Sequence, residues 1–138
     1  MAVISGTSEN DTLIGFAGDD AIYGGKGDDF LDGKSGTDTL FGARGNDILN
    51  GGDGDDILVG GKGRDKFVLQ LEQGSDAIGD FQIGEDLFLL AGGLTYDQIR
   101  VLQTKDGSAI ALATSGEILA LLPDLPANLL GFEAFSLV

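Results

Sequence analysis

The chain has 138 residues, with 24 glycines, 23 acidic residues, 8 basic residues and a formal net charge of −15. It contains no histidine and no cysteine, which excludes Ser-His-Asp and Cys-His catalysis and any zinc site with thiolate or imidazole ligands. The negative charge disfavours nucleic acid and anionic membranes as partners and favours cations, while a hydrophobic fraction of 42% is too high for a typical disordered tail.

No stretch approaches the roughly 18 consecutive apolar residues of a membrane span. Residues 1–10 show no basic segment followed by an apolar one. The sequence therefore predicts neither a transmembrane segment nor a cleavable secretory signal.

Residues 1–5 are expected to form a lead-in strand, and seven consecutive nonapeptides follow over residues 6–68. In every nonapeptide the first residue is glycine, the sixth is aspartate and the eighth is large and apolar, and the fourth is glycine in six of the seven. The aspartates are Asp11, Asp20, Asp29, Asp38, Asp47, Asp56 and Asp65; the apolar residues are Leu13, Ile22, Leu31, Leu40, Leu49, Leu58 and Phe67. A low-complexity linker would not keep an apolar residue in this phase, so the block is predicted to fold.

One large apolar side chain in nine residues cannot form a core alone, but stacked turns can bury it against one another. Positions seven to nine are expected to form a very short strand with its middle residue inward. Glycines at positions one and four are expected to allow left-handed backbone in the tight turns. Two nonapeptides then make one coil of a flattened helix, with parallel pairing between strands eighteen residues apart and the turns stacked at two edges.

Each edge is then a column of like charges unless a cation lies in it. Carboxylate and carbonyl oxygens in flexible turns are the ligands that Ca²⁺ prefers. Mg²⁺ requires a tighter octahedron, and Zn²⁺ prefers nitrogen or sulfur. The pattern therefore favours Ca²⁺ between stacked turns.

Residues 24–32 and 51–59 match the pattern G-G-x-G-x-D-x-U-x, in which U is large and apolar. On these repeats the chain resembles the RTX, or haemolysin-type, calcium-binding family. The resemblance implies a right-handed parallel β-roll with Ca²⁺ held between turns on the same edge. It also implies export by a type I secretion apparatus and folding outside the cell. Position two departs from the pattern at Thr7, Phe16, Lys34 and Ala43, and Glu9 replaces the fourth glycine of the first repeat.

If each ion bridges one turn and the turn two repeats later, seven turns give five sites. The expected pairs are Asp11 with Asp29, Asp20 with Asp38, Asp29 with Asp47, Asp38 with Asp56, and Asp47 with Asp65. Residues 74–76 and 84–86 repeat the Gly-x-Asp end of a turn, so Asp76 and Asp86 would pair with Asp56 and Asp65 and raise the number of ions to seven.

Backbone carbonyls of the turns are expected to complete the coordination shells. Those predicted belong to Gly18, Gly25, Gly27, Gly36, Gly45, Gly52, Gly54, Gly61 and Gly63. Asp80 is a further candidate ligand, with a turn-forming role as the alternative. The position-five carboxylates Asp19, Asp28 and Asp55 are expected to be solvated, with tuning of calcium affinity as the alternative.

Positions seven and nine of each repeat are expected to face outward. Tyr23, Phe41 and Val59 would then form an apolar stripe on one sheet. Two interpretations remain at this point: the C-terminal half covers the stripe, or the stripe contacts a protein, a carbohydrate or a surface.

Residues 69–138 contain ten acidic and two basic residues and no nonapeptide. Residues 69–90 are expected to close the roll through two degenerate turns and a strand at 86–90. Residues 91–138 are expected to form a β-rich cap that protects the open edge. The predicted elements of the cap are a helical turn at 95–99, a hairpin of 101–103 with 109–112, a third strand at 117–122 and a short helix at 125–130. Residues 133–138 resemble the uncleaved C-terminal export signals of the family, with a packing strand as the alternative.

The sequence thus predicts an all-β fold, a right-handed parallel β-roll with a C-terminal β-rich cap. The predicted function is that of a non-catalytic, secreted or cell-surface calcium-binding protein whose roll folds when Ca²⁺ binds. The alternative is an accessory module of an exported enzyme such as an alginate epimerase, or an adhesion module. Catalysis is not expected, because the carboxylates are accounted for as metal ligands.

Overall fold

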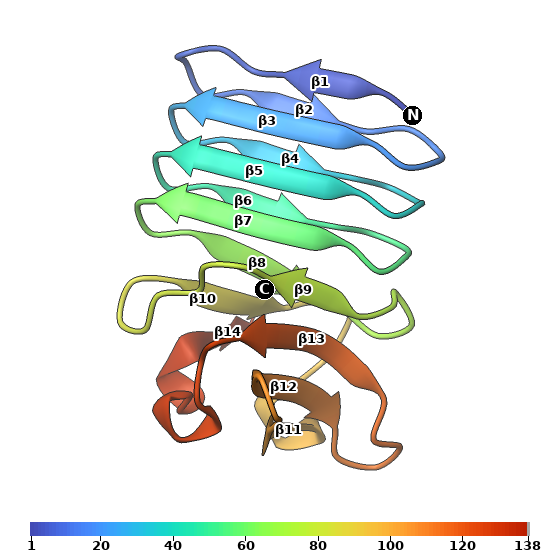
Figure 1. Ribbon diagram of the computed structural model, residues 1–138, viewed down its shortest axis with the longest axis vertical. Helices are drawn as coiled ribbons and strands as arrows, with labels where there is room; N and C mark the ends of the chain where they lie inside the picture. The colour runs from blue at the N-terminus through green and yellow to red at the C-terminus, as the bar shows by residue number, and fades with distance from the viewer. Residues whose placement is uncertain (138) are drawn as a thin grey trace.

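Strands from alternate repeats stack along one axis in the computed structural model, which describes residues 1–137 (Figure 1). The eight-stranded sheet has the order β1 (Val3–Ser5), β3 (Ala21–Lys26), β5 (Thr39–Arg44), β7 (Ile57–Lys62), β9 (Asp76–Ile78), β13 (Ile118–Pro123), β12 (Gly107–Leu112) and β11 (Ile99–Gln103). The six-stranded sheet has the order β14 (Phe135–Leu137), β10 (Leu87–Leu90), β8 (Lys66–Leu69), β6 (Ile48–Asn50), β4 (Phe30–Asp32) and β2 (Thr12–Ile14). The all-β parallel roll is confirmed.

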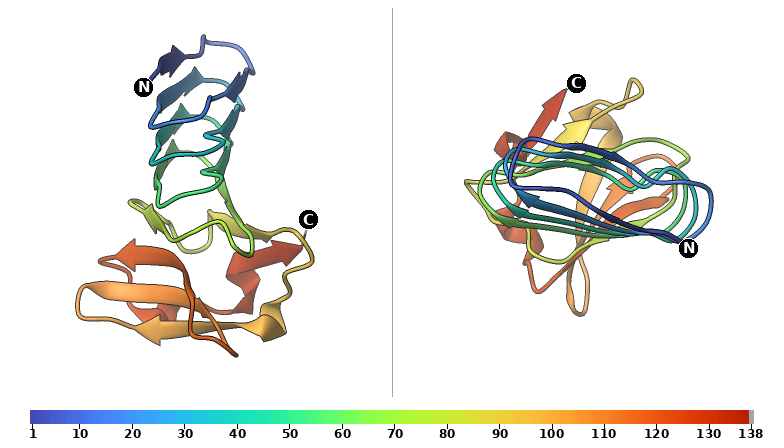
Figure 2. Two further views of the ribbon diagram at one scale, coloured as in Figure 1. Left: turned by 90° about the vertical axis from the view of Figure 1, so that its right-hand side faces the viewer. Right: turned by 90° about the horizontal axis from the view of Figure 1, so that it is seen from above.

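The pairing register is eighteen residues throughout the repeat block. Ile22 lies beside Leu40 in one sheet, and Leu13 lies beside Leu31 in the other, with parallel strands in both cases. Two nonapeptides therefore make one coil, as predicted, and the coils superimpose as a flattened tube when seen from above (Figure 2).

The position-eight side chains fill the tube between the two sheets. From the second repeat to the seventh they are completely buried: Ile22, Leu31, Leu40, Leu49, Leu58 and Phe67. Leu13, at the open end, is only partly buried. Burying one such side chain contributes about 1.5–3 kcal/mol, so the core gains a similar amount with each added repeat.

Glycine has two separate roles in the turns. From the third repeat to the seventh, positions two and four adopt positive φ, for example 104° at Gly25 and 103° at Gly27. Position one does not, so the prediction of left-handed backbone there is wrong. Its glycine is required by close approach: a Cβ on Gly24 would lie 2.6 Å from Oδ2 of Asp29 and 2.7 Å from the carbonyl oxygen of Gly42.

Strand length differs between the two sheets. The odd-repeat strands β2, β4 and β6 have the expected three residues, but β3, β5 and β7 have six. These longer strands run on through the first three positions of the following repeat. Pairing continues there, with Lys26 beside Arg44 and Arg44 beside Lys62. The two edges of the roll are therefore built differently.

The C-terminal segment continues both sheets. The predicted hairpin is present as the antiparallel pair β11 and β12, and β13 then pairs in parallel with β9. β14 pairs in parallel with β10. The predicted helical elements are single 3-10 turns, η1 (Tyr96–Gln98) and η2 (Ala127–Leu129), followed by a third, η3 (Phe132–Ala134).

The apolar stripe of Tyr23, Phe41 and Val59 is not covered by the C-terminal segment, so that interpretation is wrong. β13 extends the same sheet beyond β9 rather than lying on its face. Tyr23 remains 43% exposed. Among residues 1–137, no helix is long and apolar enough to cross a membrane.

A substitution at position one tests the close-approach argument. Gly42→Ala would place a Cβ against Oδ2 of Asp47 and the carbonyl oxygen of Gly60. It is expected to lower the free energy of unfolding by about 1–3 kcal/mol, as overpacking does, measured by urea unfolding in calcium. The matched control is Gly116→Ala. Its Cβ would meet no atom within 4 Å, so its only cost in free energy is that of a side chain at a φ of +76°. Equal stability of the two variants would contradict the argument.

Candidate metal centre

The position-six aspartates form a ladder along each edge of the roll. Oδ1 of each aspartate accepts a hydrogen bond from the backbone N–H of the aspartate one coil earlier, at 2.7–3.2 Å. The donors and acceptors are Asp11 to Asp29, Asp20 to Asp38, Asp29 to Asp47, Asp38 to Asp56, Asp47 to Asp65, Asp56 to Asp76, and Asp65 to Asp86. The structure thus brings together all seven predicted pairs, including the two from the degenerate turns.

The second carboxylate oxygen has no such partner inside the ladder. Oδ2 is buried and accepts no hydrogen bond at five positions: Asp29, Asp38, Asp47, Asp56 and Asp65. At the ends of the ladder Oδ2 does find a donor, from Thr7 to Asp11, from Phe16 to Asp20 and from Gln82 to Asp86. A buried carboxylate oxygen without a partner is costly, so the middle of the ladder requires a proton or a cation.

Burial changes the acidity of these groups. It raises the pKa of Asp47 and Asp56 to about 6, of Asp65 to about 7 and of Asp76 to about 8, with neighbouring aspartates adding to the effect. Burial also raises the pKa of Asp29, Asp38 and Asp86. Only Asp20 moves the other way, because N–H groups of Phe16 and Ala2 stabilise its charged form and lower its pKa. The interior of the ladder therefore disfavours negative charge that is not compensated.

Carbonyl oxygens of the position-four glycines lie close to the position-four glycine of the next coil. The oxygen of Gly18 approaches the α-carbon side of Gly36, where a Cβ would collide with it, and the same contact recurs from Gly27 to Gly45. The position-two carbonyl of Lys34, which does not belong to the predicted set (Gly25, Gly52 and Gly61 at this position), accepts the N–H of Asp53. Which of the predicted carbonyls complete the coordination shells stays a prediction.

A second ladder, at position five, was not anticipated. The side-chain oxygens of Asn10, Asp19, Asp28, Asn46 and Asp55 each accept a backbone N–H from the turn one coil later, at 2.8–2.9 Å. Asp19, Asp28 and Asp55 are exposed to solvent, as expected, and each also accepts a backbone N–H of the next coil. The recurrence of Asp or Asn at this position was the available signal.

Asp80 has a different environment from the ladder. Its two carboxylate oxygens accept the N–H groups of Gly60 and Gly61, at 2.9 and 2.7 Å. Both oxygens are used by one turn, which favours the turn-forming alternative for this residue.

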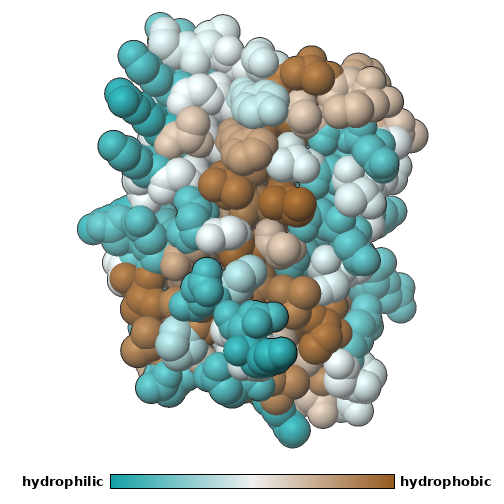
Figure 3. All heavy atoms as spheres, in the orientation of Figure 1, coloured by the Kyte–Doolittle hydropathy of each residue, from teal (hydrophilic) through white to brown (hydrophobic). Residues whose placement is uncertain are grey.

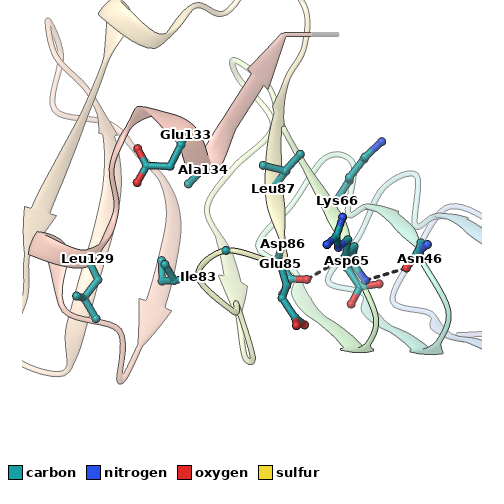
Figure 4. A pocket seen from close by; sticks show the side chains of 12 residues that line it. Asn46, Asp65, Lys66, Ile83, Glu85, Asp86, Leu87, Leu129, Glu133 and Ala134 are labelled. Carbon is teal, nitrogen blue, oxygen red and sulfur yellow. Dashed lines mark hydrogen bonds between the residues drawn. The ribbon is translucent and has the colours of Figure 1, made fainter.

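The last pair, Asp65 and Asp86, borders a cavity of about 550 Å³ between the roll and the C-terminal segment (Figure 4). Its wall also carries Arg64 and Glu133, and Ile83 contributes an apolar side chain. This end of the ladder is therefore open to small solutes.

The donor set fits Ca²⁺. It consists of oxygen atoms only, from carboxylates and carbonyls in glycine-rich turns, which suits a hard cation with flexible coordination. Within residues 1–137 no three acidic side chains gather at one point. An ion here would therefore take paired aspartates from two coils together with backbone carbonyls, and it would lie against the five oxygens that lack hydrogen bonds.

Fold and site together define a parallel β-roll with stacked metal-binding turns. The family model described as RTX calcium-binding nonapeptide repeat (4 copies) matches residues 3–31 and 32–67. The chain therefore carries the RTX repeat, a calcium-binding repeat, over this segment. No curated protein matches the sequence.

Similar solved structures include two subunits of the mannuronan C5-epimerase of Azotobacter vinelandii and an extracellular lipase. The AlgE6R3 subunit is 27% identical with a TM-score of 0.45, and the match covers 95% of this chain and 80% of that one. The AlgE6R2 subunit is 24% identical with a TM-score of 0.46, covering 97% and 91%. LipA from Serratia marcescens is 16% identical with a TM-score of 0.47, covering 96% of this chain and 39% of the lipase.

The raised pKa values predict how pH acts on the metal-free roll. Unfolded aspartates titrate near 3.8, whereas the folded carboxyls hold protons up to about pH 6 at Asp47 and about pH 8 at Asp76. This stabilisation is complete at low pH and is lost as pH rises through 6–8. With a chelator present, acidification from about pH 8 to pH 5 is therefore expected to favour the folded roll, measured as a gain of strand signal in circular dichroism. Saturating Ca²⁺ should reverse the trend, because protons and the ion compete for the same oxygens. A chelated protein with no pH dependence would contradict the burial argument.

Proposed function

We propose that the chain is a non-catalytic calcium-binding module whose roll folds when Ca²⁺ binds between stacked turns. The observation that carries the proposal is the set of five buried Oδ2 atoms without hydrogen bonds, repeated at the same position of successive coils. Without the ion these carboxylates repel one another and the glycines lose conformational entropy on ordering. With the ion, binding free energy becomes folding free energy.

The pairing supports five ions between the seven repeats and up to seven with the degenerate turns. The five central sites would use the aspartate pairs from Asp11–Asp29 to Asp47–Asp65. The two further sites would use Asp56 with Asp76 and Asp65 with Asp86, whose backbone contacts match those of the central pairs.

Export follows from the same chemistry. RTX repeat proteins are typically secreted, and calcium is scarce in the cytosol and abundant outside. A chain that folds only with Ca²⁺ would stay unfolded until it leaves the cell, which suits a type I secretion apparatus and an extracellular or cell-surface location. β14 pairs with β10, so residues 135–137 pack as a strand after folding. That packing is compatible with an earlier role in export.

Removal of calcium tests the main proposal. Circular dichroism at neutral pH is expected to show strand structure with Ca²⁺ and a largely unfolded spectrum with chelator, and readdition of Ca²⁺ should restore the strands. Mg²⁺ at the same concentration should not, because it requires a smaller octahedral shell. A chelated protein with the same spectrum and melting temperature as the calcium-loaded one would refute calcium-dependent folding.

Single substitutions test the ligand assignment. Asp47→Asn removes a charge from a residue that contacts both Asp29 and Asp65. It is expected to raise the calcium concentration at the folding midpoint by about tenfold, the equivalent of one charge-assisted ligand. Asp28→Asn is the matched control. Asn10 and Asn46 already occupy position five and accept a backbone N–H there, so an amide oxygen at position 28 would keep the hydrogen bond from Asn46. Equal midpoints for the two variants would contradict the assignment of position six.

A second candidate function is that of an accessory module of an exported enzyme. The observation in its favour is the uncovered apolar stripe, in which the rings of Tyr23 and Phe41 stack at 5.1 Å. Such a surface suits contact with a glycan or a protein. Both functions require the same folded, calcium-loaded roll.

A further inference from the structure

We propose that the outer face of the eight-stranded sheet is a dimer interface, on which a second copy of this chain packs face to face with its strands antiparallel. The face is formed by the outward residues of β1, β3, β5 and β7. The two-fold axis runs along the roll, so each coil lies over the same coil of the second copy. Only the folded roll is required, whether or not its folding depends on calcium.

Two columns of outward side chains cover this face. Position eight is buried in β3, β5 and β7, so positions seven and nine on either side of it face outward. Parallel pairing aligns these positions between strands, and β1 continues both columns. Column seven contains Val3, Ala21, Thr39 and Ile57, and column nine contains Ser5, Tyr23, Phe41 and Val59. Figure 3, in the orientation of Figure 1, shows hydrophobic atoms gathered down the middle of this face.

The face is apolar, exposed and large enough for a second copy. Neither column contains a charged residue, and Val3 is 68% and Ile57 48% exposed. Pairing through Ala77 extends column seven to Leu121 on β13. At about 4.8 Å per strand and ~3.3 Å per residue, the face from β1 to β13 measures roughly 25 by 20 Å. Two copies would bury on the order of 1,000 Å², the lower limit for a specific interface, which predicts a reversible dimer.

The sizes of the side chains are complementary under this two-fold axis. The axis places column nine of one copy on column seven of the other, at the same coil. Tyr23 then lies over Ala21 of the second copy, and Phe41 lies over Thr39. On β1 the order is reversed, with the larger residue in column seven and Ser5 in column nine. Facing surfaces that pair large with small residues can interdigitate as protein cores do.

The two edges of the roll carry opposite charge apart from the position-six aspartates. One edge is where β3, β5 and β7 end, and positions one to five of its repeats hold four cations and two anions: Lys26, Arg44, Lys62 and Arg64, with Glu9 and Asp28. The other edge is where these strands begin, and there the same positions hold three anions and one cation: Asp19, Asp53 and Asp55, with Lys34. Lys34 is already paired with Asp32. Charge acts over about 10 Å at ordinary ionic strength, so the sign of each edge does not depend on the direction of single side chains.

This charge pattern selects one of the two symmetric ways to stack the faces. An axis along the roll places the cationic edge of each copy over the acidic edge of the other. Lys26 then lies near Asp19 of the second copy, and Lys62 lies near Asp55. An axis along the strands would place cationic edge over cationic edge and acidic edge over acidic edge. The charges therefore favour the antiparallel arrangement and oppose the alternative.

Sedimentation velocity in saturating Ca²⁺, over micromolar to millimolar protein, tests the interface. The wild type is expected to pass reversibly from monomer to dimer. Ala21→Phe should weaken the dimer by about tenfold or more, because its ring would occupy the space of Tyr23 of the second copy. Thr12→Phe is the matched control: it also changes position seven, where Phe30 already occurs, but on the six-stranded sheet. It should dimerise like the wild type. If Ala21→Phe associates as strongly as the wild type, exposed apolar area alone drives association and the interface is wrong.

Charge reversal tests the orientation. The variants K26D/K62D and D19N/D53K/D55N should each be monomeric over the same concentrations. Their equimolar mixture should form a heterodimer, because each variant supplies the charge that the other lost. Both rolls should fold, since every new residue already occurs at the same position of another repeat.

A second pair of lysines provides the control for net charge. The variant K66E/K105E changes the net charge by the same amount as K26D/K62D, but its lysines lie on the six-stranded sheet and in the hairpin of β11 and β12. It should dimerise like the wild type. Equal losses in these two variants, or a mixture of the two reversed variants that stays monomeric, would overturn the antiparallel dimer.

Circular dichroism and calcium titration of the same samples separate the dimer from calcium-dependent folding. A folded, calcium-responsive wild type that stays monomeric would overturn the dimer and leave calcium-dependent folding intact. A monomer that instead binds an oligosaccharide or another protein through Tyr23 would overturn it in favour of the accessory function. A protein that folds without Ca²⁺ and dimerises with the expected response to Ala21→Phe would keep the dimer and refute the folding proposal.

Discussion

A buried carboxylate with only one of its two oxygens satisfied is the constraint on which this roll depends. One oxygen is committed to the backbone N–H of the preceding coil, which fixes the vertical register of the turns. The other is buried at five levels with no donor. The hydrogen bonds of the ladder alone therefore fix the geometry of the stack, but they leave the charge of these buried carboxylates uncompensated. Everything else in the block, from the glycines to the single apolar residue of each repeat, serves to bring these oxygens to the same place in every coil.

The glycines show how little room that arrangement leaves. At position one the carboxylate and a carbonyl of the next coil occupy the volume a side chain would need, as at Gly24. At position two the backbone turns left-handed, and Lys34 and Ala43 adopt φ of 77° and 83° despite their side chains. Non-glycine residues in this region cost on the order of 1 kcal/mol each. Side chains occur at position two in spite of that cost, whereas position one is glycine in all seven repeats. Backbone strain costs less free energy than a steric collision with the next coil.

The repeat phase allowed the fold, the eighteen-residue register and the aspartate pairs to be predicted, since all three follow from which residues recur every nine positions. Other features depend on what surrounds a residue. The close approach at Gly24 involves atoms one coil away, which the repeat pattern does not reveal. The backbone role of Asp28 also involves the next coil, and the only signal for it was the recurrence of Asp or Asn at position five. The sequence also did not decide whether the C-terminal segment covers the stripe at Tyr23, because an apolar strand such as β13 can equally cover a sheet or extend it. The extension of β3 into the next turn could not be predicted either, because it depends on the pairing of Gly25 with Ala43 in the neighbouring coil.

The mismatch between a nine-residue repeat and an eighteen-residue pairing period has a consequence for how such a molecule can change length. Inserting or deleting one nonapeptide would move every later strand to the opposite sheet. The core would survive, because position eight is apolar in all seven repeats. The surface would not: Phe41 would leave the side of Tyr23, and Arg44 would pass to the other edge from Lys26. A roll that keeps a continuous outer surface can therefore gain or lose only whole coils of two repeats. A change by a single repeat would preserve the fold but not the surface pattern.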